Sequence, residues 1–152
     1  MRLSRLRPWL PVLGWALFIF GSSTASLSTP HTSRFLIPLL RWLLPAADPE
    51  TLDLLHEFAR KCVHFVNYFV LSLLLFRALR APHRGWTWRW AALALFIASA
   101  YAASDEFHQS FEAGRGPSAR DALIDISGAS AAQLVVWIFT KPKEEQSAPA
   151  DS

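Results

Sequence analysis

The chain of 152 residues is short of charge and of cysteine. Charged residues make up 18% of it and hydrophobic residues 52%, whereas a typical soluble domain is roughly 25% charged. Its single cysteine, Cys62, excludes an intrachain disulfide, and an inert packing role is the simplest interpretation of the thiol. There is no compact metal-binding spacing such as HExxH and no nucleotide-binding loop. We therefore predict no metal site.

The hydrophobic residues fall into four blocks of about 16 to 19 residues, which run over 8–23, 63–79, 86–104 and 122–140. Each is close to the roughly 20 residues that cross about 30 Å of hydrocarbon as a helix. A soluble helix would interleave polar residues around its outer face, and several of these blocks do not. The sequence predicts an all-α integral membrane bundle of about four transmembrane helices. One domain would span 1–140, followed by a polar disordered tail over 141–152.

The first block, 8–23, has two interpretations. Its basic start and the small residues at 22–26 (SSTAS) are typical of a cleaved signal peptide. Its two prolines and two tryptophans, with three further spans downstream, favour a retained membrane anchor. We expect retention, and cleavage remains the alternative.

The distribution of Lys and Arg predicts the orientation, because cytoplasmic loops carry an excess of these residues. With four spans, both termini and the link between the second and third spans share one side, which holds about nine basic residues. The other side holds about six, mixed with most of the acids. We expect a multi-pass protein of the cell membrane with both termini cytoplasmic. The same rule accounts for the net charge of +3, so no nucleic-acid partner is expected.

The long link between the first two spans contains an apolar segment, 33–44 (SRFLIPLLRWLL), with two arginines and a proline. It is too short for a further crossing and is predicted to be an interfacial or re-entrant segment. Beyond it, Asp48 is a typical N-cap and Pro49 suits a first helical turn. A helix should begin there and continue into the second span.

Polar residues gather at the outer ends of the last three spans. At the start of the second span, Lys61, His64 and Tyr68 follow the i, i+3, i+7 rule and share one face. The third span ends in 104–111 (SDEFHQSF), which carries Asp105, Glu106, His108 and Gln109. If the helix continues there, Glu106 shares a face with Gln109, and Asp105 with His108.

The fourth span adds two carboxylates, Asp121 and Asp125, which are i, i+4 neighbours beyond the turn 112–117 (EAGRGP). Alanines at 94, 98 and 102 lead towards Glu106, and small residues of this kind let helices approach closely in lipid. We expect the third and fourth spans to pack tightly and to bring Glu106 near Asp125.

The second span should add Lys61 and His64 to the same pocket. Buried carboxylates without partners are costly, and the candidate partners are Lys61, Arg115 and Arg120.

Several of these residues also have plain structural interpretations. Asp121 at a helix start is a favourable charge, and His64 can simply hydrogen-bond between helices. Tyr68 and the seven tryptophans are typical of packing or of interface anchoring. Glu106 differs, because it ends an alanine-rich span beside three other polar residues, and a functional role is expected for it.

The polar residues resemble the signature of the VanZ-like membrane proteins, from Trp9 to about Phe139. The matching residues are Arg60, Lys61, His64, Phe65 and Tyr68, then 105–111 with Gly114 and Arg115, then Asp121, Ile124, Asp125 and Gly128. Ser22, Ser23 and Ser26 are similar to the family's serine-bearing segment. Ala113 stands where the family has proline and Asn67 where it has glutamate. Neither difference removes an acid or a base from the core set.

The family takes its name from a protein associated with resistance to the glycopeptide teicoplanin, so the resemblance implies a cell-envelope protein with a possible link to that resistance. A binding role is the first hypothesis: an outer-face pocket holds the headgroup of a membrane lipid, a lipid-linked envelope precursor or an amphiphilic compound. The pocket would comprise Lys61, His64, Tyr68, Asp105, Glu106, His108, Gln109, Arg115, Asp121 and Asp125.

The alternative is a membrane-surface enzyme acting on a lipid-linked substrate. His64 or His108 would be the base, with Glu106, Asp121 and Asp125 orienting it or holding a metal ion. No serine or cysteine has an obvious activating partner in the sequence. The sequence decides neither whether the chain is an enzyme nor which cofactor it would use.

Overall fold

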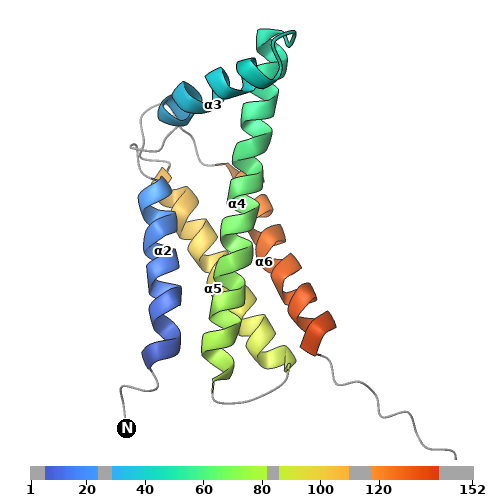
Figure 1. The fold of residues 1–152 in the computed structure, drawn as a ribbon. Helices are drawn as coiled ribbons and strands as arrows, with labels where there is room; N and C mark the ends of the chain where they lie inside the picture. The colour runs from blue at the N-terminus through green and yellow to red at the C-terminus, as the bar shows by residue number, and fades with distance from the viewer. Residues whose placement is uncertain (1–5, 24–28, 82–85, 110–117, 141–152) are drawn as a thin grey trace, which may run out of the picture.

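The computed structural model describes residues 6–23, 29–81, 86–109 and 118–140, and these are helical almost throughout, with no strand among them (Figure 1). A 3-10 helix, η1 (Arg7–Trp9), precedes five α-helices: α2 (Leu10–Ser23), α3 (Thr29–Leu43), α4 (Pro49–Arg80), α5 (Trp88–Gln109) and α6 (Ala119–Thr140). Helices α2, α4, α5 and α6 run side by side, and α3 lies across one end of them (Figure 1). The predicted all-α fold is confirmed.

Helix α4 is central, because it packs against each of the other four α-helices. It begins as predicted: Asp48 is the N-cap, its carboxylate accepts the backbone N–H of Thr51 at 2.8 Å, and Pro49 follows. The hydrogen bonds from the Thr51 N–H and hydroxyl hold the pKa of the Asp48 carboxyl below its ordinary value. The helix then continues for 32 residues, or about 48 Å, through the predicted second span.

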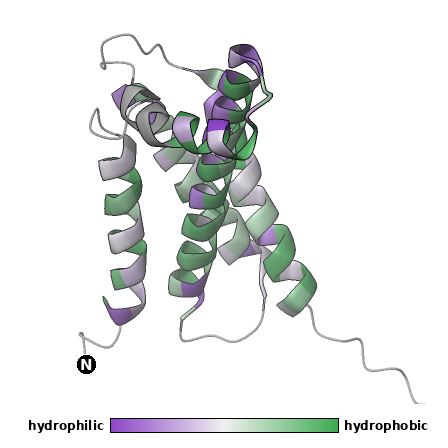
Figure 2. Cartoon of the chain, turned by 45° about the horizontal axis from the view of Figure 1, so that its top comes forward, coloured by the Kyte–Doolittle hydropathy of each residue, from purple (hydrophilic) through white to green (hydrophobic). Residues whose placement is uncertain are grey.

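Two helices, α4 and α6, are long and apolar enough to cross a membrane, on length and composition alone. Helix α5 has 22 residues but falls short in mean hydropathy, and α2 has only 14 residues, about 21 Å. The sequence prediction of four spans therefore stays a prediction. Figure 2 shows hydrophobic residues along the lengths of the helices and hydrophilic residues mostly towards their ends.

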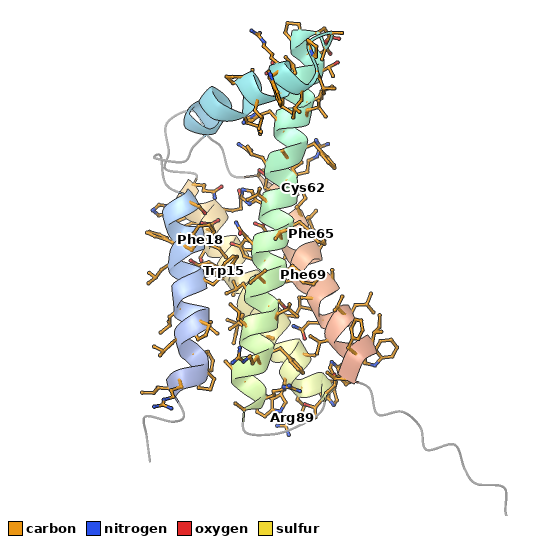
Figure 3. All side chains as sticks on the ribbon, in the orientation of Figure 1. Trp15, Phe18, Cys62, Phe65, Phe69 and Arg89 are labelled. Atoms are coloured by element: carbon orange, nitrogen blue, oxygen red, sulfur yellow. The ribbon has the colours of Figure 1, made fainter. Side chains whose placement is uncertain are left out.

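The interior of the bundle is filled by small and polar residues as much as by large apolar ones. Ala94, Ala98 and Ala102 of α5 and Ala129 and Ala132 of α6 are fully buried. Large hydrophobic side chains point outward from all the helices, among them Leu17, Phe18, Phe58, Phe96, Leu134 and Phe139. Figure 3 shows Phe18 on α2 next to Trp15, whose ring it contacts. This distribution is the reverse of a soluble bundle, whose large apolar residues face inward.

Helices α5 and α6 pack against each other, but the most extensive interface is between α4 and α6. A Cβ atom added at Gly128 would collide with the carbonyl oxygen of Phe65, so the two backbones nearly touch there. Further along, the Ser72 hydroxyl donates to the Ala129 carbonyl at 3.0 Å, and Gln133 Nε2 donates to Ser72 Oγ at 2.7 Å. The small residues of α6 therefore serve its approach to α4 as well as to α5.

Candidate functional site

Helix α5 ends and α6 begins beside α4 (Figure 1). Polar side chains from all three helices meet in this region. We call this group the polar cluster, and its members are Arg60, His64, Tyr68, Asp105, Glu106, Gln109, Ser118, Asp121 and Asp125. It holds four carboxylates against one arginine and one histidine. An acid-rich cluster of this kind favours ligands that carry hydrogen-bond donors or positive charge.

Two pairs of side chains, one helical turn apart, connect α4 to α6. His64 Nδ1 lies 3.2 Å from Asp125 Oδ1, and the Asp125 side chain is fully buried. One turn earlier on both helices, Arg60 Nη2 lies 3.8 Å from Asp121 Oδ2. Arg60 and His64 are four positions apart on α4, and Asp121 and Asp125 are four positions apart on α6, so both contacts join the same faces of the two helices. These pairs place the partly exposed Arg60 and His64 at the rim of the cluster and Asp125 at its floor.

Glu106 connects α5 to α6. Its Oε2 accepts the backbone N–H of Ser118 at 2.9 Å, and the Ser118 hydroxyl in turn accepts the N–H of Asp121 at 3.2 Å. The carboxylate therefore sits at the N-terminus of α6, where the helix dipole favours negative charge. Glu106 and Asp121 also lie within electrostatic range of Asp125. The prediction that Glu106 comes near Asp125 is confirmed in this sense.

Tyr68 lies among the carboxylates. Its side chain is 1% exposed, and its hydroxyl is within electrostatic range of Asp105, Glu106 and Asp125. Gln109 Nε2 donates to Asp105 Oδ2 at 3.0 Å. This contact forms because α5 continues to Gln109, as predicted, while positions 110 and 111 lie outside the described residues. In the part of the chain that the structure describes, the buried atoms of the cluster without a hydrogen-bond partner include Tyr68 Oη, Glu106 Oε1, Gln109 Oε1 and Asp125 Oδ2.

Most of the predicted site residues lie in the polar cluster, and a few do not. His64, Tyr68, Asp105, Glu106, Gln109, Asp121 and Asp125 come together in the cluster, whereas Arg115 lies outside the described residues. Lys61, predicted to line the pocket, instead forms an ion pair with Glu57 on its own helix. Arg60, which sequence reasoning left out of the site, contacts Asp121. The four-residue spacing of Arg60, His64 and Tyr68 is the signal that could have identified it.

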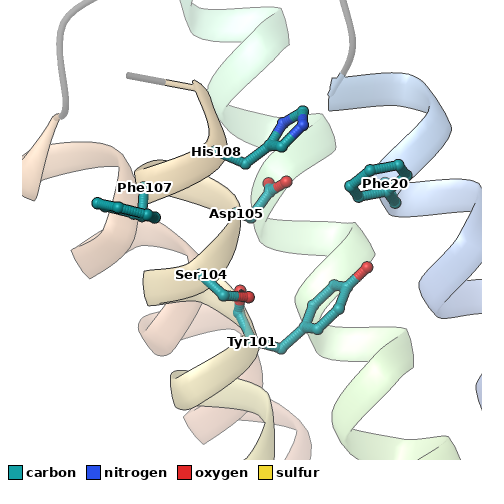
Figure 4. Close-up of a pocket in the computed structure, with 6 residues that line it drawn as sticks. All are labelled: Phe20, Tyr101, Ser104, Asp105, Phe107 and His108. Carbon is teal, nitrogen blue, oxygen red and sulfur yellow. The ribbon is translucent and has the colours of Figure 1, made fainter. Parts of the chain in front are cut away.

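His108 faces α2 rather than the His64–Asp125 pair. Its ring centroid lies 4.9 Å from that of Phe20 on α2. Beside it is a cavity of about 320 Å³ between α2 and α5, lined by Phe20, Tyr101, Ser104, Asp105, Phe107 and His108 (Figure 4). We call it the α2–α5 cavity. The rings of Tyr101 and Tyr68 lie 6.3 Å apart, so the cavity adjoins the polar cluster.

The titratable side chains of the cluster, within the described ranges, are four carboxylates, one histidine, one arginine and one tyrosine. No group of three or more His, Cys, Asp or Glu side chains there is arranged to hold a metal ion. The Ser72 hydroxyl donates to a backbone carbonyl, and Cys62 is exposed. What remains is a histidine oriented by a buried aspartate, which can bind a ligand or exchange a proton with it.

Fold and site together define the class: an α-helical bundle with span-capable helices and polar side chains buried at one end. The VanZ/LLP1 family model matches residues 9–140, and the chain belongs to this membrane-associated family. The resemblance found from the polar motifs is thereby confirmed. No curated protein and no solved structure matches the chain.

Proposed function

We propose that this VanZ-family protein is a multi-pass membrane protein whose polar cluster binds a headgroup at the outer surface. The ligand would be a lipid, a lipid-linked envelope precursor or an amphiphilic compound. In this arrangement α2, α4, α5 and α6 cross the bilayer, the amphipathic α3 lies at the interface, and both termini are cytoplasmic.

Outward-facing hydrophobic side chains support the membrane arrangement. Phe96 is 70% exposed and Phe139 82%, whereas Asp105, Glu106 and Asp125 are almost wholly buried. Water would penalise the first two, and lipid would penalise exposure of the three acids. Trp42 of α3 is 77% exposed, as expected for a residue anchored among headgroups.

The single observation that carries the binding role is the set of buried oxygen atoms without partners, above all Asp125 Oδ2 and Glu106 Oε1. Each buried polar atom left unsatisfied costs about 1–3 kcal/mol, and more when it is charged. A ligand that donates hydrogen bonds removes this cost. Hydroxyl and amine groups therefore fit the floor of the cluster, while Arg60 at the rim suits a phosphate or carboxylate.

Native mass spectrometry of detergent-purified protein tests the binding role. Glu106→Gln keeps an oxygen to accept the Ser118 N–H but removes the charge, so it should fold and lose the bound species. Glu57→Gln makes the same chemical change outside the cluster and should retain it. Equal retention by all three proteins, or no retained species on the wild type, contradicts the proposal.

A membrane-surface enzyme is the second candidate, favoured by the contact between His64 and Asp125. A buried carboxylate fixes the ring of a histidine that acts as a general base. Turnover of a lipid-linked substrate by the wild type, lost in His64→Gln and kept in Glu57→Gln, is the result that this candidate requires. Binding without turnover supports the headgroup-binding role and contradicts the enzyme.

The link to teicoplanin resistance is a separate part of the proposal. Expression of the wild-type chain in a sensitive bacterium should raise the teicoplanin concentration that stops growth, and Glu106→Gln at equal expression should not. Equal sensitivity of cells with and without the wild-type chain removes the link.

A further inference from the structure

The α2–α5 cavity is an opening between two helices that touch at only a few places. At one end, the Tyr101 hydroxyl donates to the Ala16 carbonyl at 2.7 Å. At the other end, the rings of His108 and Phe20 are in contact. Figure 4 shows Asp105 between these two bridges, on the side of α5 that faces Phe20. These two contacts keep α2 and α5 apart, so the space between the helices is a feature of the fold.

The walls of the cavity are aromatic, and its polar groups are acidic or neutral. Phe20, Tyr101 and Phe107 supply rings, and the buried Asp105 supplies a carboxylate. Neither lysine nor arginine is among its six lining residues. Gln109 Nε2 donates a hydrogen bond to this carboxylate, which carries the acidic charge of the cavity wall.

Aromatic faces beside a carboxylate attract an ammonium ion by two effects, the charge of the acid and the negative face of each ring. The volume of about 320 Å³ is at the lower end of the range for small-molecule pockets, which suits a headgroup better than a large solute. Leu17 and Phe18 of α2 are exposed, and they offer an apolar surface to the hydrocarbon part of such a ligand.

We propose that the α2–α5 cavity binds the ammonium group of an amphiphile, whose apolar body lies along the outer face of α2. This deepens the proposed function and rests on it, since it names the ligand class and the route by which a headgroup reaches the polar cluster from the bilayer. The ring contact between Tyr101 and Tyr68 joins the two sites. The ammonium group can belong to a membrane lipid or to a free amphiphilic amine.

Equilibrium binding of radiolabelled hexyltrimethylammonium to the full chain in dodecyl maltoside micelles tests this site. Unlabelled hexanesulfonate, which has the same chain and the opposite charge, serves as the competitor control. Wild-type protein should bind the cation saturably, and hexanesulfonate should not displace it. Failure of the wild type to bind saturably, or displacement by hexanesulfonate, overturns the proposal.

Two variants locate the binding. Ser104→Trp fills the cavity, and Ala103→Trp adds the same side chain at the neighbouring exposed position. We expect at least a tenfold loss of affinity in Ser104→Trp and less than a twofold change in Ala103→Trp. Asp105→Asn, which keeps the shape and removes the charge, should also lose at least tenfold. Wild-type affinity in Ser104→Trp, or in a folded Asp105→Asn, overturns the proposal.

Two further comparisons separate the possible outcomes. Competition by a lipid with an ethanolamine headgroup assigns the ammonium group to membrane lipid, and competition only by free alkylamines assigns it to a soluble amphiphile. Loss of cation binding in Ser104→Trp with unchanged lipid retention in Glu106→Gln supports the cavity and contradicts the polar cluster as headgroup site. The reverse pattern overturns the cavity and leaves the proposed function standing.

Discussion

Gly128 is the position at which a single methyl group should do most damage, because it marks the near-contact of α6 with α4. A Cβ there would collide with the Phe65 carbonyl oxygen and lie 3.0 Å from its carbonyl carbon and 3.1 Å from its Cα. Carbon atoms pack at about 3.5–4.0 Å, and the carbonyl oxygen would be closer to the Cβ than either carbon, so the helices must separate by about 1 Å or more. All three atoms belong to the backbone, and no side-chain rotation can relieve the contact.

The cost of Gly128→Ala has two parts. Overpacking of this kind costs about 1–3 kcal/mol. The displacement also stretches the hydrogen bond from Ser72 to Ala129, which is 3.0 Å long and worth about 1 kcal/mol. We expect destabilisation of about 2–4 kcal/mol in all.

Gly14→Ala is the matched control, since nothing lies within 4 Å of a Cβ at that helical position. Both substitutions gain up to about 1 kcal/mol of helix propensity, which cancels in the comparison. Unfolding by SDS in mixed micelles, followed by circular dichroism, measures the difference. Gly128→Ala should unfold at a clearly lower SDS fraction than Gly14→Ala. Equal midpoints would refute the close approach of α4 and α6.

Three further perturbations have defined outcomes in the same unfolding assay or by NMR. His64→Ala leaves the fully buried Asp125 without its partner and should cost about 3–5 kcal/mol, whereas adding Asp125→Asn should restore part of that stability; additive effects would contradict the pairing. Gln133→Leu removes the hydrogen bond to Ser72 and should cost about 0.6–1.7 kcal/mol, with no cost when Ser72→Ala is already present. The Asp48 pKa is lowered in the folded state, so the contribution of this cap is complete above the unfolded pKa of about 4 and is lost as pH falls through the folded value. A carboxyl titration by NMR with a midpoint at or above 4 would contradict the cap.

Features that depend on local chemistry could be predicted from the sequence. The start of α4 follows from the capping preference of Asp48 and the fixed φ of Pro49. The alignment of Asp121 with Asp125 follows from helical periodicity alone, and so does the continuation of α5 to Gln109. Predicting these features requires no knowledge of what the residues pack against.

Features that depend on packing between helices could not be predicted. Neighbouring residues on a helix differ in direction by about 100°, and only the position of α6 decides that Arg60 rather than Lys61 faces the carboxylates. The close approach of Gly128 to Phe65 of α4 could not be predicted for the same reason, because small residues indicate close approach without naming the partner.

His108 was assigned to the pocket through its spacing from Asp105, but its contact with α2 depends on where a helix some 90 residues earlier happens to lie. The α2–α5 cavity left no sequence signal, since its lining combines one residue of α2 with five of α5.

Photo-crosslinking with a lipid that carries a diazirine on its amine headgroup tests the central claim most directly. If the polar end of the bundle binds a headgroup, peptide mapping will find the adducts within 101–109 and 118–125. These adducts will decrease in Glu106→Gln and persist in Glu57→Gln. Adducts spread over the outward-facing residues of α6, such as Leu134 and Phe139, and unchanged by Glu106→Gln, would contradict it.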